Sequence, residues 1–229
     1  MTDGSGGPAR QTLPIMAMLR HATRDHHQRA EVALSNLISL DAPTRAAYTT
    51  TLVRLAGWYL PLEDRLNETA RSLAGIGLTW LDRRRSPSLI DDLTVLGHHG
   101  GIETCNALPS VVTLPKAVGC LYVLEGATLG GQIVVRRLRA SPEMQADPGF
   151  RFFSGYGDRT ASMWRAFGAA VSTYAERSRA DGQASRVRDE LVTSAQATFD
   201  SLMVWLSALV RPTPIQAAIP VSEPSLASD

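Results

Sequence analysis

Apolar residues recur every three or four positions along most of this 229-residue chain, which is the spacing of one face of an α-helix. Alternation of period two, which is typical of strands, occurs only in short runs such as Val111-Val112. The pattern predicts helices from 16 to about 34, from after 41 to about 74, over 87–96, from 109 or 115 to about 139, over 158–180 and over 184–210. We therefore expect an all-α protein of six to eight helices, with a Pro- and Gly-containing loop at about 140–157.

The two ends of the chain differ in composition from this helical block. Residues 1–11 are polar and rich in Gly, Ser and Pro, and residues 211–229 contain four prolines, which cannot sustain a helix. The block between them shows no linker of the kind that separates domains and no internal repeat. We expect one helical domain over 12–210 with a disordered tail on each side.

Charge and cysteine content argue against a nucleic-acid-binding, secreted or membrane protein. The 23 basic residues nearly balance the 22 acidic ones, whereas nucleic-acid-binding proteins usually carry a basic excess. Residues 1–10 lack the apolar core of a secretory signal, and no run approaches 18 uninterrupted apolar residues. Cys105 and Cys120 form no C-x-x-C motif. We expect a reduced, cytoplasmic protein with no nucleic-acid or membrane partner.

Among the five histidines, His27 has the best surroundings for a ligand. It follows Thr23 by four residues and precedes Glu31 by four, so the three share one face of the first helix, while His26 is rotated by about 100°. A carboxylate one turn away can accept the second ring N–H and so orient a metal-bound imidazole. A core histidine is the alternative, because apolar residues flank the same face.

The segment 125–132 contains three glycines, at 126, 130 and 131, inside an otherwise apolar helix. Each costs about 1 kcal/mol relative to Ala, so we expect the helix to be weakened or bent. Gly126 and Gly130 are one turn apart on the same face. Close packing against another helix, a loop, or close approach of the backbone to a flat, bulky ligand would each explain them.

Taken together, these two segments resemble the haem oxygenases. Residues 19–31 resemble the proximal helix of that family through the face that carries Thr23, His27 and Glu31. Residues 121–132 (LYVLEGATLGGQ) resemble its distal helix.

Two later segments extend the resemblance, which covers most of residues 15–210. They are the pair Phe152-Phe153 and the run MWRAF at 163–167. The sequence of these segments is most similar to bacterial members associated with bacteriophytochromes.

The resemblance implies a single all-α domain that holds haem between a proximal helix and a kinked distal helix. Haem is both substrate and cofactor, and with O₂ and electrons it is cleaved to biliverdin, CO and ferrous iron. The implied partners are haem, O₂, an electron donor such as a ferredoxin or a reductase, and a bacteriophytochrome. Supply of the biliverdin chromophore and recovery of iron are both roles that this chemistry would serve.

The resemblance also implies a role for individual positions. His27 corresponds to the proximal iron ligand and Glu31 to its partner, while Gly126 and Gly130 correspond to the catalytic distal glycines over the iron. The remaining implied haem-binding residues are Thr23 and the propionate contacts Arg20, Arg165 and Arg136 or Arg137.

This chain departs from the mammalian-type members at one position. Those members have an Asp directly after the first distal glycine, where Ala127 stands here. Glu125, Thr128 and Gln132 are the nearby polar residues, and the sequence does not choose among them for proton delivery.

Four other functions are alternatives for a helical chain of this kind. A haem-binding protein for storage, transport or sensing would use the same His27, although it would not need the distal glycines. A di-iron oxidase would need Glu-x-x-His motifs, and a thiamine-degrading enzyme a nucleophilic cysteine, neither of which the sequence supports. A helical interaction module without a ligand leaves the glycines unexplained.

Overall fold

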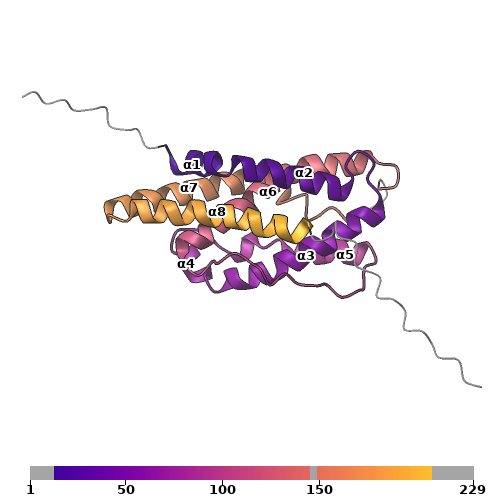
Figure 1. The fold of residues 1–229 in the computed structure, drawn as a ribbon, viewed down its shortest axis with the longest axis horizontal. Helices are drawn as coiled ribbons and strands as arrows, with labels where there is room; N and C mark the ends of the chain where they lie inside the picture. Colours follow the sequence, from indigo (N-terminus) through magenta and orange to yellow (C-terminus); the bar gives the residue numbers. More distant parts are fainter. Residues whose placement is uncertain (1–12, 145–148, 208–229) are drawn as a thin grey trace, which may run out of the picture.

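The computed structural model describes residues 13–144 and 149–207, and these form an all-α bundle (Figure 1). The helices are α1 (Ile15–Ala22), α2 (Arg24–Ile38), α3 (Arg45–Asn67), α4 (Ala70–Ala74), α5 (Ser86–Val95), α6 (Leu114–Ala140), α7 (Thr160–Ala180) and α8 (Ala184–Ser207). Two 3₁₀ turns, η1 (Leu81–Arg83) and η2 (Gly157–Arg159), complete the assignment. The all-α prediction is confirmed. The predicted tails, and the last three residues of the helix predicted to end at 210, lie outside the described residues.

The long helix α6 lies at the centre and packs most extensively against α8. The two helices approach closely at Gly119, which has no side chain. A Cβ at this position would collide with the carbonyl oxygen of Leu191 on α8. Within the described residues, α6 is the one helix long and apolar enough to cross a membrane, but 67% of its most apolar window is buried in the protein. Its hydropathy is therefore that of a core helix.

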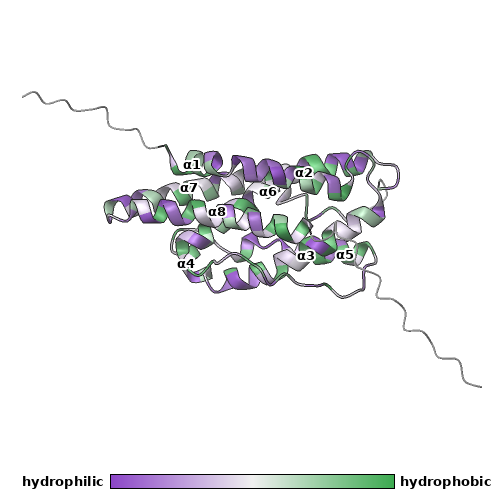
Figure 2. Cartoon of the chain, viewed as in Figure 1, coloured by the Kyte–Doolittle hydropathy of each residue, from purple (hydrophilic) through white to green (hydrophobic). Residues whose placement is uncertain are grey.

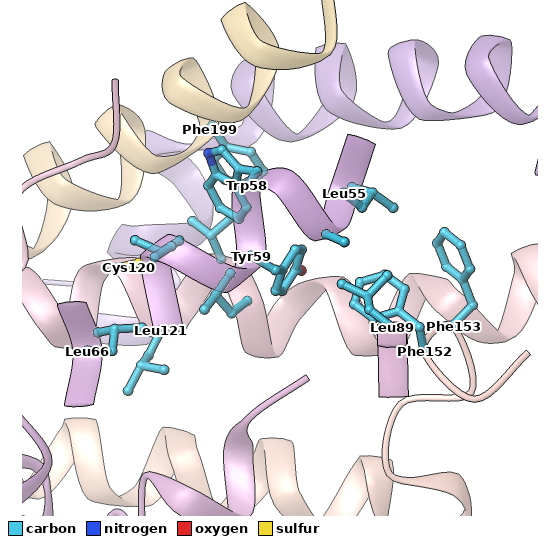
Figure 3. Packing of buried hydrophobic residues seen from close by; sticks show 14 of the residues in the cluster. Leu55, Trp58, Tyr59, Leu66, Leu89, Cys120, Leu121, Phe152, Phe153 and Phe199 are labelled. Carbon is cyan, nitrogen blue, oxygen red and sulfur yellow. The ribbon is translucent and has the colours of Figure 1, made fainter. Parts of the chain in front are cut away.

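Aromatic residues fill the core on the side of α3 (Figure 3). Tyr59 lies edge-on to Trp58 at 5.2 Å and to Phe152 at 5.1 Å, and Phe152 contacts Phe153 at 5.1 Å. The helices that surround this core are amphipathic, with polar and apolar residues on different faces (Figure 2). The loop that carries Phe152 and Phe153 is thereby fixed against α3.

The first predicted helix, from 16 to 34, is interrupted at Thr23, where φ is −108° and ψ is 5°. The Thr23 hydroxyl donates to the Leu19 carbonyl at 2.8 Å and so competes with regular helical bonding. The backbone bonds nevertheless continue, from the Thr23 N–H to Leu19 and from the His27 N–H to Thr23. The prediction of one continuous helix was wrong. The helical register is nevertheless the same on both sides of the break, so Thr23 and His27 still share a face.

Two further predictions need adjustment. The helix predicted from 41 to 74 ends at Asn67, whose side chain accepts a hydrogen bond from Trp80 Nε1 at 2.7 Å, and α4 follows after a turn. The glycines at 126–131 do not interrupt α6, which is helical throughout. Burial of α6 in the core offsets the low helix propensity of its glycines.

Candidate functional site

The imidazole of His27 projects from α2 with about half of its surface accessible. Its side chain is 53% exposed, and Nδ1 lies 3.5 Å from Oε2 of Glu31. The ring packs edge-on against Phe199 of α8, with centroids 6.1 Å apart. Because Glu31 faces Nδ1, Nε2 is the ring nitrogen available to a metal.

The neighbouring His26 has a different environment. Its side chain is only 20% exposed, and its Nε2 lies 3.6 Å from Oδ1 of Asp200 on α8. One turn earlier, Gln196 of α8 donates to the Ala22 carbonyl at 2.9 Å. His26 therefore helps to hold α2 against α8, while His27 lies at the edge of that contact with about half of its side chain exposed.

The three glycines of α6 fall into two groups. A Cβ built at Gly126 or Gly130 would meet nothing within 4 Å, whereas one at Gly131 would collide with the carbonyl oxygen of Phe153. Beside the two open glycines, Leu129 is 41% exposed and Ile133 is 62% exposed. Close packing therefore explains Gly131, and an open apolar helix face remains at the other two positions.

At one end of this open face, α6 meets the junction of α1 and α2. Burial raises the pKa of Tyr122, while hydrogen bonding to Thr23 and the positive charge of Arg20 oppose the rise. The Tyr122 ring also lies 5.8 Å from that of Trp164 on α7. Thr23, Tyr122 and Trp164 thus close this end, with Arg20 nearby.

Helices α2 and α6 meet again at their C-terminal ends. Arg137 Nη1 of α6 lies 4.0 Å from Asp41, just beyond α2, and the Ser141 hydroxyl donates to the Pro43 carbonyl at 3.1 Å. The two helices therefore run in the same direction. The two contacts that join them are separated by about 22–27 Å along the helix axes. Between these contacts α2 packs mainly on α8 and α3 rather than on α6.

His27 and the open glycines lie at the same level along the two helices. His27 lies one turn after Thr23, and Gly126 lies one turn after Tyr122, so both are displaced equally from the contact that joins the helices. We refer to the region between the two contacts, with the accessible imidazole of His27 on α2 and the bare backbone of Gly126 and Gly130 on α6, as the slot. Ile133 adds apolar surface further along.

The predicted cationic residues lie at the surface of the protein. Arg20, Arg136 and Arg165 are all exposed. Arg137 is on the same face of α6 as Gly130, seven residues earlier, whereas Arg136 is rotated by about 100°. Of the two alternatives at the end of α6, Arg137 is the one directed along the slot.

The three polar residues considered for proton delivery lie on the rear of α6, away from the slot. Glu125 is 1% exposed and accepts a hydrogen bond from the Tyr156 hydroxyl at 2.7 Å. Thr128 donates to the Glu125 carbonyl at 2.7 Å, and Gln132 donates to the Ser154 carbonyl at 3.1 Å. In this arrangement none of them is directed at the space over Gly126 and Gly130.

Sequence reasoning did not single out Tyr122, Ile133 or Phe199 as residues of the site. Two of them could have been found by helical spacing, because Tyr122 precedes Gly126 by four residues and Ile133 follows Gly130 by three. No sequence signal connects Phe199 to His27, since 172 positions separate them and only the packing of α8 on α2 brings them together.

The cysteines are inert in this fold. Cys105 and Cys120 are both buried, and burial raises the pKa of the Cys120 thiol to about 12, opposed by a hydrogen bond with Thr198. A thiol of this kind is a poor nucleophile. The described residues also contain no cluster of three or more His, Cys, Asp or Glu side chains that could hold a metal. Neither a cysteine-dependent nor a di-iron reaction is supported.

We expect both cysteines of the folded protein to resist thiol reagents at pH 8. Labelling with 5,5′-dithiobis(2-nitrobenzoate) should reach less than about one tenth of the rate measured after unfolding in guanidinium chloride, because only the exposed thiolate reacts. Rapid stoichiometric labelling of the native protein would show that a cysteine is accessible and would reopen the nucleophile hypothesis.

The residue types in the slot are those that the resemblance implies for haem. A flat macrocycle needs one wall that supplies an axial ligand and an opposite wall without side chains, and His27, Gly126 and Gly130 would provide these. The apolar ring edge would contact the exposed Leu129 and Ile133, and the propionates would need cations such as the exposed arginines.

Comparison with known proteins identifies the family of the chain. The family model described as Heme oxygenase matches residues 13–208. A curated heme oxygenase from Xanthomonas campestris pv. campestris (strain 8004) is 31% identical over 177 residues, which are 76% of this chain and 94% of that protein. The crystal structure of NO- and CO-bound heme oxygenase from Neisseria meningitidis has the same fold, with a TM-score of 0.68, 17% identity, and coverage of 91% of this chain and 100% of that one. The chain is a member of the haem oxygenase family.

Proposed function

We propose that this haem oxygenase holds haem in the slot between α2 and α6, with His27 as the iron ligand, and cleaves it to biliverdin, CO and ferrous iron. The observation that carries this proposal is the pairing of a half-exposed imidazole with two glycines whose Cβ positions are empty. When bound, haem supplies the iron at which O₂ is activated.

The residues of the chain have separable tasks in this proposal. Glu31 accepts the Nδ1–H of His27 and holds the ring with Nε2 directed at the iron. The backbone at Gly126 and Gly130 approaches the opposite face of the macrocycle more closely than any side chain would permit. Thr23, together with Tyr122, closes one end of the slot and limits how far the ring can enter.

The electrons come from a separate donor protein, for which we propose a ferredoxin or a reductase. We place the reaction in the cytoplasm. The biliverdin serves either as the chromophore of a bacteriophytochrome or as the by-product of iron recovery. Growth on haem as the iron source, compared with photoreceptor assembly in a deletion strain, separates these two roles.

Aerobic reduction of the haemin complex tests the reaction itself. The purified protein is titrated with haemin, reduced in air, and followed by absorption spectroscopy and chromatography of the pigment. We expect loss of the Soret band and formation of biliverdin in a yield close to the haem consumed. A Soret band that persists through repeated reduction would instead identify a haem-storage or haem-transport protein.

We expect Arg20 and Arg165 to bind the propionates. Replacing either with Ala should weaken haemin binding by up to about 3 kcal/mol, the upper end of the range for hydrogen bonds to charged groups, and should mix the biliverdin isomers by loosening the in-plane orientation of the ring. Haemin titration and isomer analysis measure both effects. Unchanged affinity and isomer composition in both variants would assign these arginines to the solvated surface, where both are exposed.

A further inference from the structure

A buried ionic cluster supports the rear of α6, directly beneath the open glycines. Glu125 immediately precedes Gly126, and its Oε2 lies 2.9 Å from Nη1 of Arg83. Its other oxygen accepts the Tyr156 hydroxyl at 2.7 Å. The side chains of Arg83 and Glu125 are only 5% and 2% exposed. A buried charge is tolerated only when it is paired in a defined geometry, so this contact constrains where Glu125 can lie.

The loop that carries Tyr156 contacts the same side of α6 at further points. The Ser154 carbonyl accepts a hydrogen bond from Gln132 at 3.1 Å, and the Phe153 carbonyl lies against Gly131. Together with Glu125, these α6 residues lie on the side turned away from the slot. The loop therefore braces α6 over nearly two turns of helix.

The loop is itself fixed to the rest of the bundle. The Asp92 carboxylate of α5 accepts the backbone N–H groups of Arg151 and Phe152, at 2.9 and 2.8 Å. The Arg85 guanidinium donates to the carbonyls of the same two residues, at 3.0 and 2.9 Å. The brace behind α6 is thus connected to α5 and to the segment that contains Arg83.

We propose that Glu125 is a positioning residue for haem cleavage, whose ion pair with Arg83 and hydrogen bond from Tyr156 set the rotation and height of the Gly126–Gly130 backbone above the haem. This inference rests on the proposed function. Three glycines within six residues lower the intrinsic stability of this part of α6. Glu125 does not face the slot, so it acts through the backbone of Gly126 rather than on the substrate.

Two variants and one control separate positioning from ordinary stabilisation. Glu125→Gln removes the charge that pairs with Arg83, and Tyr156→Phe removes only the hydroxyl that reaches Glu125. The control is Tyr48→Phe, because that buried hydroxyl donates to Gly149 of the same loop at 2.8 Å and not to Glu125. All three changes preserve side-chain shape.

The first measurement uses the haem-free protein. Amide hydrogen exchange over residues 121–132 should become at least about tenfold faster in Glu125→Gln and in Tyr156→Phe, because local opening of α6 is easier without the brace. The control should exchange at the wild-type rate in this segment. Unchanged exchange in Tyr156→Phe overturns the proposal, and that variant alone decides if Glu125→Gln does not fold.

The second measurement uses the ferrous CO complex of the haem-loaded protein, whose C–O stretching band reports the surroundings on the distal side. We expect the band to shift or split in both α6 variants and to keep its wild-type position in Tyr48→Phe. Faster exchange with an unchanged band would show that Glu125 only stabilises the fold, and would also overturn the proposal. Failure of the wild-type protein to bind haem would refute the proposed function instead.

Discussion

Replacing His27 with Ala should lower the rate of haem cleavage at least about a hundredfold, because loss of even an outer partner of a metal ligand costs 10–100-fold. In the proposed site, Nε2 of His27 would bind the iron, because Nδ1 is directed at Glu31. The absorption spectrum of the ferric haemin complex should change with the loss of its protein ligand, and added imidazole should restore part of it. Turnover and spectra are measured on the same preparation.

The matched variant is His26→Ala. His26 packs on α8 beside Asp200, so its replacement should lower the thermal midpoint slightly and leave the ferric spectrum and turnover as in the wild type. If the His26 variant alone loses the ferric spectrum, the register of α2 in the site is displaced by one residue and the assignment of His27 is wrong.

Adjacent glycines of α6 should respond to alanine in opposite ways. In Gly130→Ala the added methyl group enters open space, so the haem-free protein should be as stable as the wild type or more stable by up to about 1 kcal/mol. Biliverdin yield should nevertheless fall sharply, because the methyl group occupies the space above the macrocycle that O₂ requires. Thermal midpoint and biliverdin yield are determined together.

Gly131→Ala is the comparison that the structure supplies. Its methyl group would collide with the Phe153 carbonyl oxygen, and overpacking of this kind costs about 1–3 kcal/mol. A lower thermal midpoint is therefore expected. Full biliverdin yield in Gly130→Ala would remove the argument for a bare distal wall, and a neutral Gly131→Ala would show that α6 and the loop can separate without cost.

Helical spacing was sufficient to predict much of the fold and which residues of the first helical segment share a face. Apolar periodicity predicted the all-α bundle and the approximate extent of α5 to α7, because core-facing residues of a helix must recur at that spacing. The same arithmetic predicted that His27, and not His26, shares a face with Glu31, and the structure shows that face accessible. Local sequence determines these features, since each depends on residues within one or two turns.

Features that depend on tertiary contacts were not predictable in this way. The helix is interrupted at Thr23, where φ is −108° and ψ is 5°, and the apolar periodicity continues through this position. Gly130 and Gly131 are equivalent in the sequence, and only the position of the loop behind α6 makes one open and the other packed. Arg83 stands in a run of three arginines that is typical of a solvated surface, yet it is buried against Glu125 on a distant helix.

The proposed haem site can be checked in a crystal structure of the ferric haemin complex. We expect haem between α2 and α6, with the iron bonded to Nε2 of His27 and the opposite face of the ring against the backbone of Gly126 and Gly130. Iron ligated by another residue, or haem bound outside this slot, would contradict it.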